Sequence, residues 1–222
     1  RILDRIIIHY LHQAGRSFEK FRFIWHKIED LYDIEERKKI LLAKSFGEQC
    51  SCRQNVLLDS IEAENGTFSF LFDVYCSHFK LEEFIHETND SNQNLMHLIA
   101  KNMSVSIFKV ATHQLHENFL RILQTIELNC KETDMRKLLY QADGLRKIPF
   151  NHAMRNECLH ALKIFHAIYS KFFNRKDLKS LLEKSEKWNI YEQNDDEEKE
   201  EFLRFIVENY QIKFVRFLND FN

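Results

Sequence analysis

The scarcity of turn-forming residues is the feature that most limits the folds open to this chain. Only four Gly and one Pro occur among its 222 residues, whereas Phe occurs twenty times. A sheet-rich sandwich or barrel needs a tight turn after nearly every strand, and Gly and Pro supply most such turns. The composition therefore favours long helices joined by polar connections, and the length is sufficient to bury a sizeable core.

The spacing of the apolar residues points the same way. Through most of the chain they recur three and four positions apart, which is the spacing of one face of a helix. Phe68, Leu71, Phe72 and Tyr75 are an example. We therefore predict an all-α chain. Three segments rich in turn residues interrupt the pattern, at 87–94, 129–134 and 142–149.

Net charge and cysteine content bear on the binding partners and the cellular location of the protein. The net charge is -2, with basic and acidic residues interleaved, so the chain lacks the basic stripe typical of nucleic-acid binding. Five scattered Cys residues indicate free thiols and an intracellular location, cytoplasmic or nuclear. No apolar run approaches the roughly 20 residues of a membrane span. Because the chain begins with Arg1, we expect it to be a fragment of a longer protein.

The sequence contains none of the motifs that mark a metal or phosphate site. Four Gly are too few for a glycine-rich phosphate cradle. His113 and His116 share one helical face, but two ligands do not make a closed zinc site. Cys50 and Cys52 lack the spacing of a C-x-x-C pair. We predict no metal and no cofactor.

Neighbouring carboxylates offer no catalytic arrangement either. Glu35 and Glu36, like Glu82 and Glu83, are adjacent in sequence, and adjacent residues on a helix point in different directions. Such side chains do not converge on a substrate. No constellation of nucleophile, base and orienting group can be named, so we predict no catalytic residue and no enzymatic activity.

One sequence pattern occurs more than once. The stretch from Asn94 to Met103, NLMHLIAKNM, matches the stretch from Ile148 to Glu157, IPFNHAMRNE, in the order of apolar and polar positions. Weaker copies begin near Leu11 and near Asn55. The pattern resembles the ankyrin repeat, whose first helix opens with T-P-L-H. Pro149 takes the place of that Pro, His97 takes the place of that His, and Asp143-Gly144 loosely matches the family's D-x-x-G turn.

The resemblance implies an all-α solenoid of stacked helical pairs with irregular repeats and a helical cap at each end. It also implies that His97 is structural and bonds neighbouring backbone. The copies are spaced irregularly, at 47, 38 and 54 residues (58-11, 96-58 and 150-96), against roughly 33 for a regular repeat. The repeats are therefore expected to contain lengthened or inserted helices, and a HEAT-like or tetratricopeptide-like array remains an alternative.

We divide the single domain, 1–222, accordingly. Its expected parts are an N-terminal cap with a first repeat (1–50), two repeats (51–114), inserted helices (115–141), a further repeat (142–193) and a C-terminal capping helix (194–222). The twenty Phe residues are expected to lie mostly between the repeats, where neighbouring units share a core.

The function that this architecture implies is protein binding. We predict a scaffold that binds a partner protein and modulates host or cellular signalling, as the resemblance to ankyrin arrays implies, since some degenerate arrays act on host signalling. The alternative is an accessory or regulatory domain of a larger enzyme or channel. The expected contacts lie in the loops between the repeats. They are Asn89, Asp90, Ser91, Asn92, Asp143, Gly144, Leu145 and Arg146.

Overall fold

The structure is a computed structural model. It describes residues 2–14, 17–44, 55–61, 66–106, 112–154, 159–174, 176–178, 180, 204, 205 and 208. Every regular element within these ranges is an α-helix, which confirms the prediction of an all-α chain. The predicted C-terminal capping helix, 194–222, lies outside the described residues except for Arg204, Phe205 and Glu208. Cys50, Cys52 and Cys158 also lie outside them.

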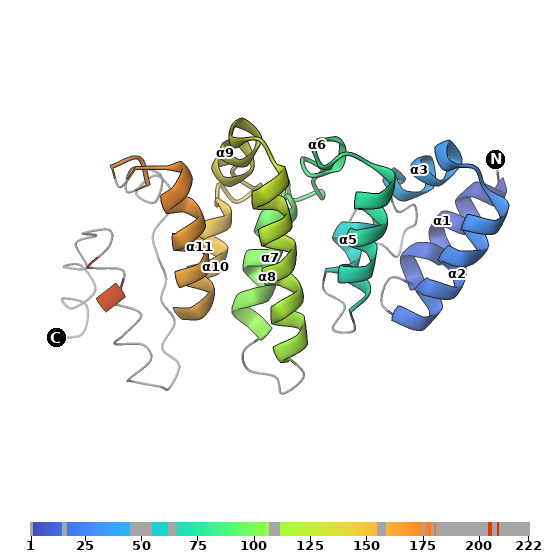
Figure 1. Cartoon of the computed structure of the whole chain (residues 1–222), viewed down its shortest axis with the longest axis horizontal. Coiled ribbons are helices and arrows are strands. Elements are labelled where there is room, and N and C mark those ends of the chain that lie inside the picture. The colour runs from blue at the N-terminus through green and yellow to red at the C-terminus, as the bar shows by residue number, and fades with distance from the viewer. Residues whose placement is uncertain are drawn as a thin grey trace.

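The helices form a row in which the same three kinds of helix follow one another (Figure 1). The first helices are α1 (Ile2–Ala14), α4 (Val56–Ser60), α7 (Leu95–Ser106) and α10 (Pro149–Met154). The second helices are α2 (Phe18–Leu31), α5 (Thr67–His78), α8 (Thr112–Asn129) and α11 (Leu159–Phe172). Shorter third helices, α3 (Ile34–Leu42), α6 (Leu81–Phe84) and α9 (Glu132–Tyr140), lie along one edge. We call α1–α3, α4–α6, α7–α9 and α10–α11 units 1 to 4.

Each second helix ends in the same way. The backbone N–H of the residue directly after the helix donates to the carbonyl four residues before it, at 2.8–3.0 Å. The four donors are Tyr32, Phe79, Cys130 and Phe173. The next residue is extended and starts a new helix: Asp33, for example, accepts from Glu36 N–H, and Asn174 accepts from Asp177 N–H. A side chain therefore caps the joint in units 1 and 4, whereas Lys80 and Lys131 at the joints of units 2 and 3 make no side-chain cap bond.

Aromatic side chains fill the space between the units. Phe21, Phe68 and Phe119 occupy matching places, seven residues before the carbonyl that accepts the joint bond, and all three are buried. The ring centroids of Phe68 and Phe119 lie 5.7 Å apart. Each fully buried Phe contributes roughly 1.5–3 kcal/mol, so these contacts compensate for connections with few turn residues.

Two of the three junctions between units use the same pair of contacts. The Tyr75 hydroxyl donates to the Leu41 carbonyl between units 1 and 2, and the Tyr169 hydroxyl donates to the Leu139 carbonyl between units 3 and 4. At these junctions Lys38 and Arg136 also lie over the rings of Phe79 and Phe173, respectively.

The junction between units 2 and 3 uses exposed ion pairs. Arg121 binds Asp73, with the closer nitrogen and oxygen 2.8 Å apart, and Lys131 binds Glu82, also at 2.8 Å. The buried hydroxyl bonds of the other two junctions are shielded from solvent, whereas these charge pairs are screened by water and salt.

Three predicted copies coincide with helix starts. Helices α4, α7 and α10 begin directly after Asn55, Asn94 and Ile148. In the first two, the Asn side chain caps the helix by accepting from the backbone N–H three residues on, at 3.0 and 3.2 Å. The fourth copy, near Leu11, lies inside α1, which begins at Ile2.

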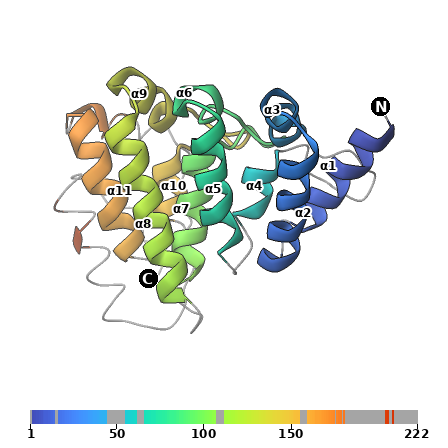
Figure 2. The same cartoon turned by 45° about the vertical axis from the view of Figure 1, so that its right-hand side comes forward.

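The region expected to hold inserted helices, 115–141, has a different place in the fold. It forms most of α8 and all of α9, and α8 packs against α7 and α5. These helices occupy the positions that α5 and α6 occupy in unit 2, so they are regular members of unit 3 (Figure 2). The long spacing before Pro149 arises because α7 and α8 are longer than α4 and α5. Among the described helices, none is both long and apolar enough to cross a membrane.

Candidate functional site

The first predicted contact segment forms a tight loop before α7, here called the first tip (89–93). Asn89 N–H donates to the Gln93 carbonyl, and Asn92 N–H donates to the Asn89 carbonyl, at 3.1 and 2.9 Å. The Asn89 side-chain oxygen accepts from the backbone N–H groups of Ser91 and Gln93. Asn92 has a φ of 57°, a left-handed conformation that Asn tolerates better than most residues.

The second predicted contact segment, the second tip (143–147), has the same bonds before α10. Asp143 N–H donates to the Lys147 carbonyl and Arg146 N–H donates to the Asp143 carbonyl. The Asp143 carboxylate accepts from the N–H groups of Leu145 and Lys147, at 2.8 and 2.9 Å. Arg146 has a φ of 60°, matching Asn92. The two tips therefore have one backbone design with different side chains.

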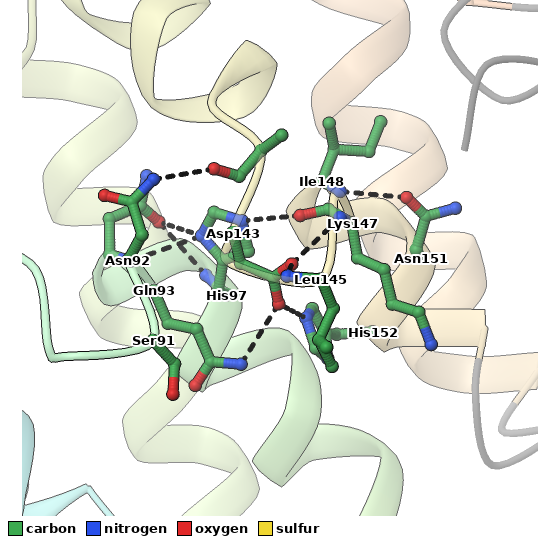
Figure 3. Close-up of polar contacts among 12 residues, drawn as sticks. Ser91, Asn92, Gln93, His97, Asp143, Leu145, Lys147, Ile148, Asn151 and His152 are labelled. Atoms are coloured by element: carbon green, nitrogen blue, oxygen red, sulfur yellow. Dashed lines mark hydrogen bonds and ion pairs between the residues drawn. The ribbon is translucent and has the colours of Figure 1, made fainter. Parts of the chain in front are cut away.

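The two tips lie directly against each other (Figure 3). Gly144 N–H donates to the Ser91 carbonyl at 2.7 Å, and the Asn92 side-chain amide donates to the Ala142 carbonyl at 2.9 Å. A Cβ atom added at Gly144 would lie 3.1 Å from the Ser91 carbonyl oxygen, a tight contact, so this approach favours a Gly. The tips thus form one continuous surface held by bonds between units 3 and 4.

His97 joins the first helix of unit 3 to the second tip. Its Nε2 lies 3.0 Å from the Lys147 carbonyl oxygen, which confirms the expected bond to neighbouring backbone. At the other side of the ring, Asn94 N–H donates to Nδ1 at 3.2 Å. We assign the ring proton to Nε2. A proton on Nδ1 would suit its 2.7 Å approach to the Asn94 side-chain oxygen, but a lone pair would then face the Lys147 carbonyl.

The environment of His97 keeps its ring neutral. Burial, followed by the nearby His152 ring, lowers the pKa of His97 to about 4. The bond to the Lys147 carbonyl and the charge of Asp143 oppose this shift without cancelling it. A neutral, fully bonded imidazole stabilises a helix start and is poorly suited to act as an acid or base at neutral pH.

Asp143 connects the second tip to the first tip and to α10. Besides the two backbone donors, it accepts from His152 Nε2 at 2.9 Å and from the Gln93 side chain at 3.2 Å. Burial is the largest influence on its carboxyl group and raises the pKa, but these hydrogen bonds together hold the pKa below its ordinary value. The Asp143 side chain is 0 % exposed. Its predicted contact with a partner is therefore corrected: the carboxylate organises the loop and does not reach the surface.

The remaining predicted contact residues lie at the surface of the tips. Asn89 is half-buried by its own loop bonds. The others are exposed, and Leu145, a large apolar side chain, is 62 % exposed. These exposed residues are Asp90, Ser91, Asn92, Gly144, Leu145 and Arg146.

Three residues that hold the tips together were missed by the sequence analysis: Gln93, Gln141 and His152. Gln93 binds Asp143, and Gln141 accepts from the Asn94 side-chain amide at 3.1 Å. A signal was present, because Asn89 and Asp143 precede the matched residues Asn94 and Ile148 by the same number of positions. Extending the repeat alignment toward the N-terminus would have aligned the two tips.

Other candidate reactive groups have structural partners. Glu36 and Glu83 cap helices by accepting from Asp33 N–H and Lys80 N–H. The hydrogen bond and charge of Lys131 lower the pKa of Glu82. These carboxylates hold helix starts and unit junctions, in agreement with their divergent directions.

The two described thiols are unsuited to nucleophilic chemistry. Burial, with a smaller contribution from Asp73, raises the pKa of Cys76 to about 11, and burial with Asp134 raises that of Cys130 to about 11. Both thiols are therefore protonated at neutral pH, whereas the thiolate is the nucleophile.

The histidines of α8 do not complete a metal site in the described part of the chain. The His116 ring packs at a tilt of 46° against the His160 ring of α11, with centroids 4.4 Å apart, and the side chain of His113 lies outside the described residues. The described residues contain no group of three or more His, Cys, Asp or Glu side chains placed to hold a metal.

Comparisons of the chain with protein-family models, curated proteins and solved structures find no match.

Proposed function

We propose that the protein is an ankyrin-like solenoid that serves as a scaffold and binds a partner protein through the surface of its two tips. The ankyrin-like assignment is supported by the recurrence of one joint in four units and by the two tips with one backbone design. It is further supported by His97, which bonds the backbone of the following unit as the resemblance implies. Stacked units of this kind offer an extended surface and a continuous core.

The observation that carries the binding function is the pre-organised state of the tips. Bonds within and between the loops fix the backbone under Asp90, Ser91, Asn92, Leu145 and Arg146 before any partner arrives. A surface that is already ordered loses little conformational entropy on binding. The surface also combines an acidic, a basic and a large apolar side chain, a mixture suited to recognising a folded protein.

A comparison of two surface variants tests this function. The immobilised chain would be exposed to a lysate of its native cell, and retained proteins identified by mass spectrometry. The double variant Leu145→Asp/Arg146→Asp changes the tip surface, whereas Leu128→Asp changes an 84 % exposed apolar residue at the end of α8. We expect some proteins to be retained by the wild type and by the Leu128 variant but not by the tip variant. Identical sets of retained proteins for all three chains would refute binding at the tips.

A further inference from the structure

Two junctions of the row are held by the same buried bond. Tyr75 and Tyr169 lie four residues before the donor of the joint bond in units 2 and 4, and both are buried. Each hydroxyl donates to the eighth residue of the preceding third helix, which is Leu41 in α3 and Leu139 in α9. One side chain thus fixes the second helix of a unit to the third helix of the unit before it.

The junction between units 2 and 3 lacks both partners of this bond. The matching residue of unit 3 is Ile126, whose carbonyl accepts the joint bond from Cys130 but whose side chain has no hydroxyl. The acceptor side also differs, because α6 has four residues whereas α3 and α9 have nine. The eighth position counted from the start of α6 is Thr88, which lies outside any helix. The donor and its helical acceptor are therefore absent from the same junction.

The ring that lies beneath a cation at the other two junctions is absent here as well. Phe79 and Phe173 directly follow α5 and α11, and Lys38 and Arg136 of the preceding units lie over them. The residue that directly follows α8 is Cys130, which has no ring. Three parts of one connection, the donor, the acceptor and the ring, thus differ at a single junction.

The contacts that the described residues make across this junction rest mainly on one pair of rings and on charges near the surface. Phe68 of α5 and Phe119 of α8 are buried, with ring centroids 5.7 Å apart. Arg121 binds Asp73 beside them, and these side chains are 44 % and 57 % exposed. The other charged contacts are Lys131 with Glu82 and His86 with Asp134. Exposed charge pairs contribute little and weaken further in salt, so the ring pair is the main fixed point.

Both tips lie on one side of this junction. The first tip bonds the second through the Ser91 carbonyl and the Asn92 side chain. At the start of α7, the Asn94 side chain donates to the Leu138 carbonyl of α9. The first tip is therefore fixed to units 3 and 4, although it directly follows unit 2 in the chain.

We propose that the row bends at the junction between units 2 and 3. Units 1 and 2 move as one body against units 3 and 4, which carry both tips, and the contact between Phe68 and Phe119 is the pivot. Ionic strength sets the freedom of this motion, because salt screens the charge pairs that flank the pivot. Bending changes how the surface of units 1 and 2 is oriented relative to the tips, and so changes the shape offered to a partner that spans both bodies.

Pulsed electron spin resonance on the whole chain tests the bending. Nitroxide labels would be attached to encoded keto amino acids at exposed positions, so that the native cysteines stay unmodified. The label pairs are Lys20 with Lys80 for the first junction, Lys80 with Glu117 for the second and Glu117 with Ser170 for the third. We expect the second pair to give the widest distance distribution. It should widen further as salt rises from ~0.1 M to ~1 M, which shortens the Debye length from about 10 Å to about 3 Å.

Two variants separate the charge pair from exposed ion pairs in general. Arg121→Met should widen the second distribution at low salt toward its width at high salt, because it removes the pair with Asp73. The matched control is Lys171→Met, which removes an exposed pair with Glu127 across the third junction. It should leave the third distribution unchanged, since the Tyr169 hydroxyl bond remains.

A third variant tests whether the buried hydroxyl makes a junction rigid. Tyr75→Phe removes the bond to the Leu41 carbonyl with little change in volume and should widen the first distribution. Circular dichroism confirms that each variant is folded. Three equally narrow distributions at both salt concentrations, an equal response to Arg121→Met and Lys171→Met, or a folded Tyr75→Phe chain with an unchanged first distribution would each overturn the proposal. The measurement involves no partner, so its outcome is independent of binding at the tips.

Discussion

The two tips show how one backbone shape can be held in two ways. In both, the first residue accepts two backbone N–H groups and the fourth residue has a positive φ. Only the side chains at equivalent positions differ: Asn89 corresponds to Asp143, Asp90 to Gly144 and Asn92 to Arg146. The backbone design therefore depends on an acceptor at the first position, which both Asn and Asp provide.

The tips differ in the hydrogen bonds that they make outside their own loops. Asn89 is neutral and half-buried, and the hydrogen bonds of its side chain stay within its own loop. Asp143 is buried, charged and bonded to Gln93 of the other tip and to His152 of α10. The first tip is thus a local turn, whereas the second connects neighbouring units. Equivalent substitutions should have unequal effects on stability.

The largest difference is expected for removal of the first-position acceptor. Asp143→Ala leaves several buried donors without their acceptor and should lower the free energy of unfolding by about 3–5 kcal/mol. Asn89→Ala removes three bonds in a partly solvated loop and should cost only about 1 kcal/mol. Urea unfolding of both variants measures the two values. Equal losses would show that the tips are equivalent after all.

The second prediction concerns pH and tests whether His97 supports the second tip as a neutral ring. The unfolded chain protonates His97 near its ordinary pKa of 6.5, whereas the folded protein resists protonation until about pH 4. The neutral His97 ring therefore contributes fully to the free energy of unfolding above pH 6.5, and this contribution declines by about 3 kcal/mol as the pH falls toward 4.

The matched variant for this prediction is His97→Gln, whose amide can still donate to the Lys147 carbonyl but does not titrate. Unfolding free energies at a series of pH values should show a shallower decline for the variant than for the wild type between pH 6.5 and 4. Parallel curves for the two proteins would mean that His97 is not the group responsible.

The third prediction exchanges the second residues of the tips. Gly144→Asp places a Cβ close to the Ser91 carbonyl and should weaken the bond between the tips, at a cost of about 1–2 kcal/mol. The reverse change, Asp90→Gly, meets no such crowding and should alter stability by less than about 0.5 kcal/mol. Thermal unfolding compares the two. A neutral Gly144→Asp variant would indicate that the tips separate without cost.

The smallest effect is expected at the fourth position. Arg146 has a left-handed backbone without the tolerance that Asn has, so Arg146→Gly should stabilise the protein by about 0.5–1 kcal/mol. Asn92→Gly relieves less strain and loses the bond to the Ala142 carbonyl, so it should stabilise less or destabilise. Differential scanning calorimetry of the two variants shows whether each is more or less stable than the wild type. Stabilisation by Asn92→Gly that exceeds that of Arg146→Gly would contradict this account of the strain.

Much of the local structure could be predicted from the residues. The copies of the repeated pattern at Asn55, Asn94 and Ile148 coincide with three helix starts, because the caps and first-turn residues that begin a helix act within a few residues of the chain. The region 115–141 was predicted to be helical, and it is. It was expected to be an insertion between the repeats, whereas it forms most of α8 and all of α9, the second and third helices of unit 3. Helix length was the obstacle: the longer α7 and α8 changed the spacing of the copies, and spacing alone does not distinguish a longer helix from an inserted one.

The candidate site was predictable as a set of loops and unpredictable residue by residue. Turn-forming residues marked both tips, and the exposed Leu145 and Arg146 were included in the expected contacts. The same reasoning placed Asp143 at the surface, because a charged residue in a polar loop is usually exposed. Its burial depends on His152 and Gln93, which lie nine and fifty residues away in the chain.

The sequence by itself determined that this chain is helical and where several of its helices begin, since helix periodicity and capping are local properties. Tertiary structure alone decided that the two tips lie together and that Asp143 is enclosed by donors from three segments. The physical reason is that burial depends on which units lie side by side. A residue's identity sets its preference for burial, and its neighbours in space decide whether that preference is met.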